Sequence, residues 1–427
     1  MLVSRNPKLS NFIAAVSFVG SLPIAVADTS QLDSMKRTFG TIRTIAGTGE
    51  NEDGNFWSPS FEGAQGTDVE LSNPHMTMAD AAGNYYIADK ESHSVLKVET
   101  SGKLTTYAGT HASGNGGEGL ATEVALNNPN GLFVQPDGRV YVLDTFNRKI
   151  RRIGSDLQMT TLIEDTGGFG PGRGLWVSPD EGTVYYTGSG AIKKWTPDGG
   201  SETIARGISD PGNLTVDPDG HLVVTSSRGG HQVFRLLPDG TKQHIAGDGS
   251  TDEDPDGGKP ATEVGLERVR GIAFRADGSY FLATQKGGDV WFVDTDNIIH
   301  RFIDGDPSGN ANNGDGELIT PGSKIAEPRS ISLAPSGDLI ITTNDKGYIR
   351  VVRNITPPPA ETLDLNFETK TVTWQGFANR DYIVEGSSEL KGWQLRSDSP
   401  GIAGVNTFRD LQKILRREYY YRVSVEP

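Results

Sequence analysis

The most constraining feature of the sequence is a unit that recurs six times within residues 41–353. Each copy has an apolar β run, a P-D-G-like turn, a second β run, a polar turn and a third β run. The clearest copy extends from Pro129 to Asp144. The turn glycine recurs as Gly83, Gly138, Gly182, Gly220, Gly278 and Gly337. A unit of this size cannot bury its apolar face alone, so the repeat predicts six small sheets that pack against one another.

A fourth strand follows the first five copies, as in Leu104–Gly109, which makes each unit a four-stranded blade. The sixth copy differs, because Thr356–Pro359 follows it and proline cannot donate to a strand ladder. The stretch Thr41–Gly47 has the fourth-strand pattern but precedes the first blade. We expect it to join blade six and close a ring over residues 41–354, which removes two exposed sheet edges. The predicted fold is all-β, a six-bladed β-propeller closed by an N-terminal strand.

These units resemble NHL repeats, and Gly174–Gly247 also looks like the gluconolactonase/senescence-marker-protein propellers. The phrases Asp256–Thr262 and Gly119–Thr122, each just before a new blade, resemble the D-G-G-P-A-T loops of bacterial NHL proteins. The resemblance covers roughly three quarters of the chain and implies the six-bladed NHL-like fold. It implies no single activity, because this scaffold hosts lactonases, lyases and proteins that only bind.

The N-terminal residues 1–27 are typical of a signal peptide. Arg5 and Lys8 form a basic region, and Phe12–Ala27 is an apolar stretch that ends in an A-x-A cleavage site. We expect the mature chain to start near Asp28, with a lead-in over residues 28–40, no membrane span, and a secreted or periplasmic location. The alternative is an uncleaved anchor, but the apolar stretch is short and contains Pro23.

Beyond the propeller, residues 355–360 form a Pro-rich linker and residues 361–427 alternate apolar and polar side chains. The alternation is strongest in Thr371–Trp374, Tyr382–Glu385 and Tyr419–Val425. This part resembles a small fibronectin type III-like β-sandwich, and it is expected to act as a spacer or attachment module. Trp393 could contact a glycan, although packing in the core is the more common role of such a ring.

The composition excludes several classes of function. The chain has 40 Lys+Arg against 55 Asp+Glu, a net charge of −15, which disfavours nucleic acid as a partner. It has no cysteine, so disulfides, zinc–thiolate sites and cysteine nucleophiles are absent. We expect a monomer whose partner is a small anionic ligand or a protein, bound at the face that carries the long loops 48–72, 110–127, 248–268 and 304–327.

The candidate site is the set of residues that open the innermost strands beside the central channel. The equivalent positions are His75, Asn130, Arg173, Gly212 (with Asn213 displaced by one), Arg270 and Arg329. In the gluconolactonase relatives, matching positions supply metal ligands, and only Asn130 keeps that character here. A divalent cation would be repelled by three guanidinium groups, and a zinc site would need more histidines than His75. No metal is therefore expected at this site.

Arginine forks bind carboxylate, sulfate or phosphate through paired hydrogen bonds, so the same residues predict an anion site at the channel mouth. The alternative is that each arginine pairs with a loop acid such as Glu267, Asp315 or Glu327. One functional hypothesis is a ligand- or protein-binding scaffold. The other is a lactone hydrolase or lyase acting on an acidic saccharide, with His75 as the general base.

Two acidic loops are candidates for Ca²⁺, namely Asp252–Asp256 and Asn310–Glu317. Neither has the spacing of an EF-hand, so solvated acidic loops are the alternative. Asp89 and Asp144 end second strands, where the resemblance to NHL repeats implies a structural role in holding the next turn.

Overall fold

The computed structural model describes residues 30–50, 54–170, 172–188, 190–253, 257–306, 314–319, 325–344 and 346–354, followed by six strands between Asp364 and Val425. The predicted signal peptide, the Pro-rich linker and Trp393 lie outside the described residues. Within the described ranges, no helix has the length and apolar character needed to cross a bilayer.

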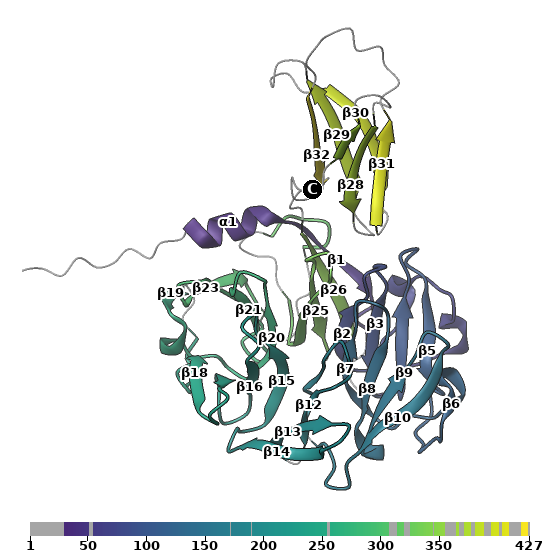
Figure 1. The fold of residues 1–427 in the computed structure, drawn as a ribbon, viewed down its shortest axis with the longest axis vertical. Helices are drawn as coiled ribbons and strands as arrows, with labels where there is room; N and C mark the ends of the chain where they lie inside the picture. The colour runs from purple at the N-terminus through teal and green to yellow at the C-terminus, as the bar shows by residue number, and fades with distance from the viewer. Residues whose placement is uncertain are drawn as a thin grey trace, which may run out of the picture.

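Six antiparallel sheets are arranged as blades around one axis, which confirms the predicted all-β, six-bladed propeller (Figure 1). Blade 1 contains β2 (Pro74–Ala79), β3 (Tyr85–Asp89), β4 (Ser94–Val98) and β5 (Leu104–Gly109). Blade 2 contains β7 (Pro129–Val134), β8 (Val140–Asp144), β9 (Lys149–Ile153) and β10 (Gln158–Glu164). Blade 3 contains β11 (Leu175–Val177), β12 (Val184–Gly188), β13 (Ala191–Thr196) and β14 (Gly200–Arg206).

The second half of the ring repeats this plan. Blade 4 contains β15 (Pro211–Val216), β16 (Leu222–Ser226), β17 (Gln232–Leu236) and β18 (Lys242–Ala246). Blade 5 contains β20 (Val269–Phe274), β21 (Tyr280–Thr284), β22 (Val290–Val293) and β23 (Ile298–Ile303). Blade 6 contains β24 (Pro328–Leu333), β25 (Leu339–Thr343), β26 (Tyr348–Asn354) and β1 (Phe39–Ala46). Neighbouring innermost strands contact each other all the way round, from β2 through β7, β11, β15, β20 and β24 back to β2.

The outermost strand of blade 6 comes from the start of the described chain. β1 is hydrogen-bonded to β26, with Thr44 opposite Arg350. It is preceded by α1 (Ser30–Thr38), whose Met35 is buried with Phe39 against residues of blades 5 and 6. The Gln31 side chain bonds to Asp296 in blade 5. The lead-in of residues 28–40 therefore contains a helix that the sequence reasoning did not anticipate.

The repeated tight turn explains why each first strand folds back on its second. Gly83 and Gly138 have φ values of 84° and 89°, a left-handed conformation that glycine adopts without strain. In blade 3, however, the prediction for Gly182 is wrong. The turn closes through the bond from the Glu181 N–H to the Ser178 carbonyl, and Glu181 takes the left-handed position with φ of 59°.

Much of the long connecting segments is tied to the blades rather than free on the loop-rich face. β6 (Gly119–Leu120) pairs with β10, and β19 (Gly257–Pro260) pairs with β23, so each adds a short fifth strand to its blade. A fifth strand covers backbone groups that an outer edge would otherwise expose. The sequence expectation of open binding loops is therefore corrected for these segments.

Three connections also share a six-residue segment that we call the junction wedge. The three copies are Gly66–Leu71, Ala121–Leu126 and Ala261–Leu266, each of which begins with one turn of 3-10 helix: η2 (Gly66–Asp68), η3 (Ala121–Glu123) and η5 (Ala261–Glu263). In each copy the valine and the leucine are buried between two consecutive blades. The wedges therefore fill the space between neighbouring sheets with apolar side chains.

The C-terminal strands form two three-stranded sheets. One contains β27 (Asp364–Asn366), β28 (Thr371–Gly376) and β31 (Gly404–Arg409). The other contains β29 (Asp381–Ser387), β30 (Gln394–Pro400) and β32 (Tyr420–Val425). Trp374 from the first sheet and Tyr382 from the second are both buried, with ring centroids 5.5 Å apart.

Candidate functional site

Five of the six innermost strands begin with a β-bulge. The register shifts lie between Pro74 and Met76, Pro129 and Gly131, Pro211 and Leu214, Val269 and Gly271, and Pro328 and Ser330. A bulge leaves a residue outside the ladder and redirects its side chain. In blade 3, Arg173 lies two residues before β11. In blade 4 the equivalent position is Gly212, with Asn213 displaced by one. We call the six polar residues the axial ring: His75, Asn130, Arg173, Asn213, Arg270 and Arg329.

Three ring residues form a hydrogen-bonded chain across blades 2, 1 and 6. Asn130 donates its Nδ2 to the Gly172 carbonyl at 3.1 Å, which orients its Oδ1 toward His75 Nδ1. Because an amide oxygen can only accept, His75 Nδ1 carries the proton. His75 Nε2 then accepts from Arg329 Nη2 at 3.1 Å. Both nitrogens of the imidazole are therefore engaged.

The other two ring arginines have few partners. Arg173 is 8% exposed, and its Nε and Nη1 have no hydrogen-bond partner among the described residues. Arg270 is fully buried and donates Nε to Ser227 Oγ at 3.1 Å. Within the same part of the chain its Nη1 and Nη2 lack hydrogen bonds, and the nearest carboxylate oxygen, Asp210 Oδ2, lies 3.8 Å away. Both guanidinium groups thus retain unused donors in a buried place.

The electrostatics of the ring agree with this geometry. Burial lowers the pKa of Arg270, and the neighbouring charges of Arg173 and Arg329 lower it further, while Asp210 acts in the opposite direction. Burial also lowers the pKa of Arg173, again opposed by Asp210. Because a guanidinium keeps its proton in proteins, these shifts measure how unfavourably the positive charges are held. Among the described residues, their positive charge is only partly compensated.

His75 experiences the same field. Burial lowers the pKa of His75 well below its ordinary value, and the charges of Arg329, Arg173 and Lys90 lower it further. The hydrogen bond with Asn130 acts in the opposite direction but does not outweigh them. The imidazole is therefore neutral at physiological pH, which agrees with the hydrogen-bond pattern.

Two of the acids that could have neutralised the arginines are engaged elsewhere. Asp315 accepts from Arg350 Nη2 at 2.8 Å, and Glu327 accepts from Lys286 Nζ at 2.6 Å. Asp210, which the sequence reasoning missed, is the acid beside the ring. It precedes Pro211 and has a left-handed φ of 40°. Four of the other innermost strands are preceded by a residue that is also left-handed, namely Asn73, Asn128, Arg268 and Glu327. The position of Asp210 directly before the first strand of its blade was the feature of the sequence that could have pointed to it.

Most residues of the axial ring are buried and do not line an open channel mouth. His75, Asn130, Arg173, Asn213 and Arg270 are all buried, and Arg329 is half-buried. The expectation of an open positive rim at the channel mouth is therefore corrected, because five of the six side chains are buried. Directly beyond the ring, the innermost strands of all six blades line a cavity of about 150 Å³. Its walls are mainly apolar, and Asn213 is one of its few polar lining residues.

The metal candidates lie away from the ring. Within the described residues, one group has three potential ligands close together: Asp217, Asp219 and His221. Asp217 already accepts the His221 N–H and Arg235 Nε, so its oxygens hold the turn. The predicted Ca²⁺ loops are only partly described, because residues 254–256 and 310–313 lie outside the described ranges. The Ca²⁺ hypothesis stays a prediction.

The aspartates that end second strands hold neighbouring backbone. Asp89 Oδ1 accepts the Ser72 N–H at 2.7 Å, and Asp144 Oδ1 accepts the Asn127 N–H at 2.8 Å. Asp144 also binds Asn147 in the following turn and forms a fully buried ion pair with Arg151. These contacts have the structural character that the resemblance implied.

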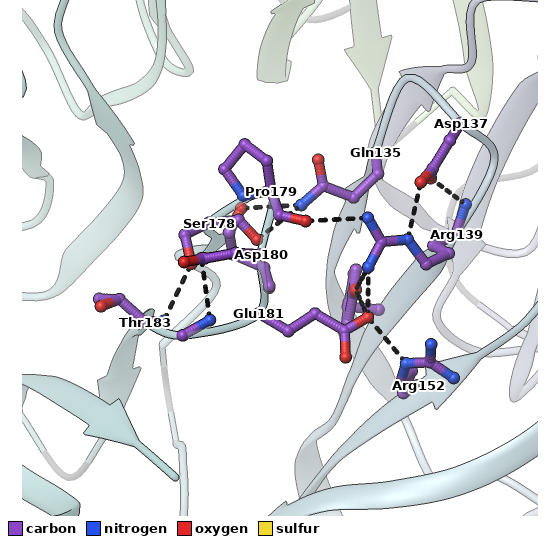
Figure 2. Close-up of polar contacts among 12 residues, drawn as sticks. Gln135, Asp137, Arg139, Arg152, Ser178, Pro179, Asp180, Glu181 and Thr183 are labelled. Atoms are coloured by element: carbon purple, nitrogen blue, oxygen red, sulfur yellow. Dashed lines mark hydrogen bonds and ion pairs between the residues drawn. The ribbon is translucent and has the colours of Figure 1, made fainter.

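A second arginine cluster lies between blades 2 and 3 (Figure 2). Glu181 Oε1 accepts from Arg139 Nη1 at 2.5 Å, from Arg152 Nε at 2.9 Å and from the Tyr141 hydroxyl at 2.6 Å. Arg139 also bonds to Asp137 Oδ2 and to the Pro179 carbonyl. Both arginines in this cluster have a carboxylate partner, so the cluster joins blades 2 and 3.

Comparisons with known proteins give the fold a context. No family model matches the chain. It is 28% identical over 144 residues to protein SUPPRESSOR OF QUENCHING 1, chloroplastic, of Arabidopsis thaliana, and 25% identical over 143 residues to NHL repeat-containing protein 2 of Gallus gallus. Each match covers 33% of this chain, but only 14% and 20% of those relatives. The chain therefore spans a small fraction of the curated relatives it matches.

Solved structures show the likeness over a longer stretch. A structural genomics protein of unknown function from Bacteroides thetaiotaomicron superposes with a TM-score of 0.58 and 14% identity, over 73% of this chain and 75% of that one. An auxiliary nutrient binding protein from Bacteroides ovatus superposes with a TM-score of 0.54 and 13% identity, over 74% and 77%. At these identities the likeness shows the propeller fold and nothing finer.

Proposed function

We propose that this protein is an exported NHL-type propeller that binds a small anionic ligand at the axial ring. The observation that carries the proposal is the pair of buried guanidinium groups, Arg173 and Arg270, whose donors lack hydrogen-bond partners among the described residues. A buried charge without a partner costs several kcal/mol, so a site of this kind is stabilised when an anion enters it. The two forks suit a carboxylate or sulfate, which accepts paired hydrogen bonds.

The finer features of the molecule belong to the same proposal. The pairing of β1 with β26 supports a ring closed by the N-terminal strand. The two C-terminal sheets, in contact through Trp374 and Tyr382, support a fibronectin type III-like module that spaces or tethers the propeller. The A-x-A site at Ala25–Ala27 supports export, to the periplasm or out of the cell, as part of the proposal. The nutrient-binding relative of similar fold is consistent with a binding role.

The enzymatic alternative needs His75 as a general base, and the geometry disfavours it. A base must present a free lone pair to the proton that it removes. In the ring, Nδ1 faces Asn130 and Nε2 accepts from Arg329. His75 therefore fixes the orientation of Arg329, and binding without turnover is the better function for this arrangement.

The test is calorimetric titration of the full chain with acetate and with sulfate in an anion-poor buffer. We expect one saturable site. The variant Arg173→Gln should weaken binding at least tenfold, because one charge-assisted bond contributes about 1.5–3 kcal/mol. Arg206→Gln, at an exposed arginine of β14, is the matched control and should bind like the wild type. Equal affinities for all three proteins would disprove the proposal.

A further inference from the structure

The cavity beside the axial ring is closed at one end and more open at the other. On β2, Met76 is 7% exposed and Met78 is half-buried. On β24, Ile331 is 2% exposed and Leu333 is half-buried. Exposure thus increases from Met76 to Met78 and from Ile331 to Leu333, toward the face of the tight turns. At the ring end Arg329 is half-buried but the other five ring residues are buried, so the ring end is the more closed one and we take the turn face as the entrance.

The closed end carries the unused donors. Asn213 lines the cavity, is 2% exposed, and its Nδ2 has no hydrogen-bond partner among the described residues. Arg270 and Arg173 each lie two residues before a cavity-lining residue, Ile272 and Leu175 respectively. With about 3.3 Å of rise per residue, the ring lies within about 7 Å of the apolar walls. The two arginines therefore lie close to the apolar walls along the same strands, and Asn213 belongs both to the ring and to the cavity lining.

Apolar side chains from all six blades line the cavity. One residue from each blade illustrates this: Met76, Phe133, Leu175, Leu214, Ile272 and Ile331. An apolar cavity of roughly 150 Å³ in another protein stays dry and holds benzene. The cavity on this axis has about 150 Å³ as well, so it offers space for one phenyl ring or a short aliphatic chain.

From these observations we infer that the ligand is a small amphiphilic carboxylate, with its carboxylate at the axial ring and a phenyl-sized or short aliphatic body along the cavity. The inference rests on the proposed anion site and adds the chemistry of the rest of the ligand. It also changes the face at which the ligand enters the propeller: the ligand comes from the face of the tight turns, whereas the sequence favoured the face of the long loops. Asn213 is assigned as the third donor to the carboxylate, between the two arginines and the apolar walls.

The experiment is a titration of the full chain with acetate, butyrate, hexanoate and benzoate. Each buried methylene contributes about 0.8 kcal/mol, so affinity should rise roughly fourfold per methylene until the cavity is full. Benzoate should bind more tightly than acetate for the same reason. An affinity that does not change along the series would overturn the inference while leaving the anion site intact.

Two variants narrow the turn-face end of the cavity and test whether the apolar body of the ligand lies there. Leu333→Phe and Met78→Phe should each weaken hexanoate at least tenfold and leave acetate within twofold of the wild type. Two different sites are used so that one misfolded variant, recognised by its melting temperature, still leaves a test. If both variants fold and bind hexanoate like the wild type, the body does not lie in this cavity.

A neutral probe separates the two proposals. Hexanol should bind weakly, and Arg173→Gln should reduce the affinity for hexanoate toward that for hexanol. If hexanol and hexanoate bind equally and Arg173→Gln changes neither, the apolar pocket exists but the anion site is disproved. If acetate binds in an Arg173-dependent manner and hexanoate gains nothing, the anion site stands and the amphiphilic ligand is disproved.

Discussion

The arginines of blade 2 and those of the axial ring make an instructive contrast. Arg139, Arg151 and Arg152 each contact a carboxylate, either Asp144 or Glu181. Arg173 and Arg270 are at least as buried as Arg139 and Arg152, yet the nearest carboxylate oxygen in an ion-pair contact is 3.8 Å from Arg270. The same side chain therefore occurs in two environments. Where the chain supplies a carboxylate, arginine joins elements of the fold, and where it does not, our proposal assigns arginine to the binding of a ligand anion.

This contrast has an energetic consequence that mutations can test. Removing a paired, buried arginine leaves its carboxylate without a partner, which costs several kcal/mol. Removing an under-compensated one takes away an unfavourable charge, so the free energy of unfolding should hardly fall and can increase. The same substitution should therefore lower the free energy of unfolding when it is made at a paired arginine, and leave it unchanged or raise it when it is made at an under-compensated arginine.

The largest effect is expected at Arg151. Its side chain is fully buried, pairs with Asp144 at 3.1 Å and also bonds to the Gly116 and Gly117 carbonyls ahead of β6. Arg151→Met should lower the free energy of unfolding by about 3–5 kcal/mol, because a buried pair is broken. Urea unfolding followed by circular dichroism measures the change. A loss below about 1 kcal/mol would show that Asp144 is satisfied without its partner.

Glu181 should give the next largest effect, with a characteristic pH dependence. Burial alone would raise the pKa of Glu181, but the hydrogen bonds from Tyr141, Arg152 and Arg139 outweigh it and lower the pKa below its ordinary value. Glu181→Gln should therefore cost about 1–3 kcal/mol at pH 7. A carboxyl with a lowered pKa stabilises the fold above its ordinary pKa and stops doing so as the pH falls through the lowered value.

Thermal unfolding of wild type and Glu181→Gln over a pH series tests this directly. The difference in melting temperature should be full at pH 7, should begin to shrink below the ordinary carboxyl pKa of about 4.3, and should disappear once the pH is below the lowered pKa of the folded state. A difference that stays constant down to pH 3 would mean that shape, and not charge, makes Glu181 important.

Arg173→Met should not lower the free energy of unfolding, in contrast to Arg151→Met. In an anion-free buffer we expect the free energy of unfolding to rise by about 1 kcal/mol or stay unchanged, because the substitution removes a buried charge without breaking a hydrogen bond among the described residues. Adding sulfate should then raise the melting temperature of the wild type but not of the variant. A loss as large as that for Arg151→Met would place Arg173 in the same class as the blade-2 arginines.

Arg152→Gln should have the smallest effect. Its pair with Glu181 is partly exposed, with 33% and 23% of the two side chains accessible. Exposed and half-exposed pairs contribute about 0.5 kcal/mol, and salt screens them. The cost should shrink further in 1 M NaCl, which denaturant titration at two salt concentrations can measure. An undiminished cost at high salt would indicate that the guanidinium acts through packing.

The sequence allowed the blade count and the ring positions to be predicted, because most first strands open with a phrase that resembles N-P-x-G, as in Asn128–Gly131. It did not reveal that these residues are buried, since exposure depends on how the starts of six strands from different blades pack together. The sequence also did not predict the wedges, although Val124 and Leu126 are apolar residues within the long loop 110–127. Their burial depends on the neighbouring blade, which local pattern cannot show.

Blade 3 shows a different limit. The spacing favoured Gly182 as the turn glycine, but the adjacent Glu181 takes the left-handed position because its carboxylate is held by three donors from blade 2. A tertiary network thus overrides the local preference for glycine. No pattern within blade 3 alone could have signalled this, because the partners lie some 30 to 40 residues earlier in the chain.

The five bulges at the starts of the innermost strands separate recognition from folding. A residue outside the ladder does not belong to the alternation that fills the space between sheets, so changing it leaves the apolar layers of the blades in place. Five blades each offer such a position, so guanidinium, imidazole, amide or carboxylate groups can be exchanged around a single axis. Under the proposed function, these exchanges would change the charge that the axial ring presents to a ligand.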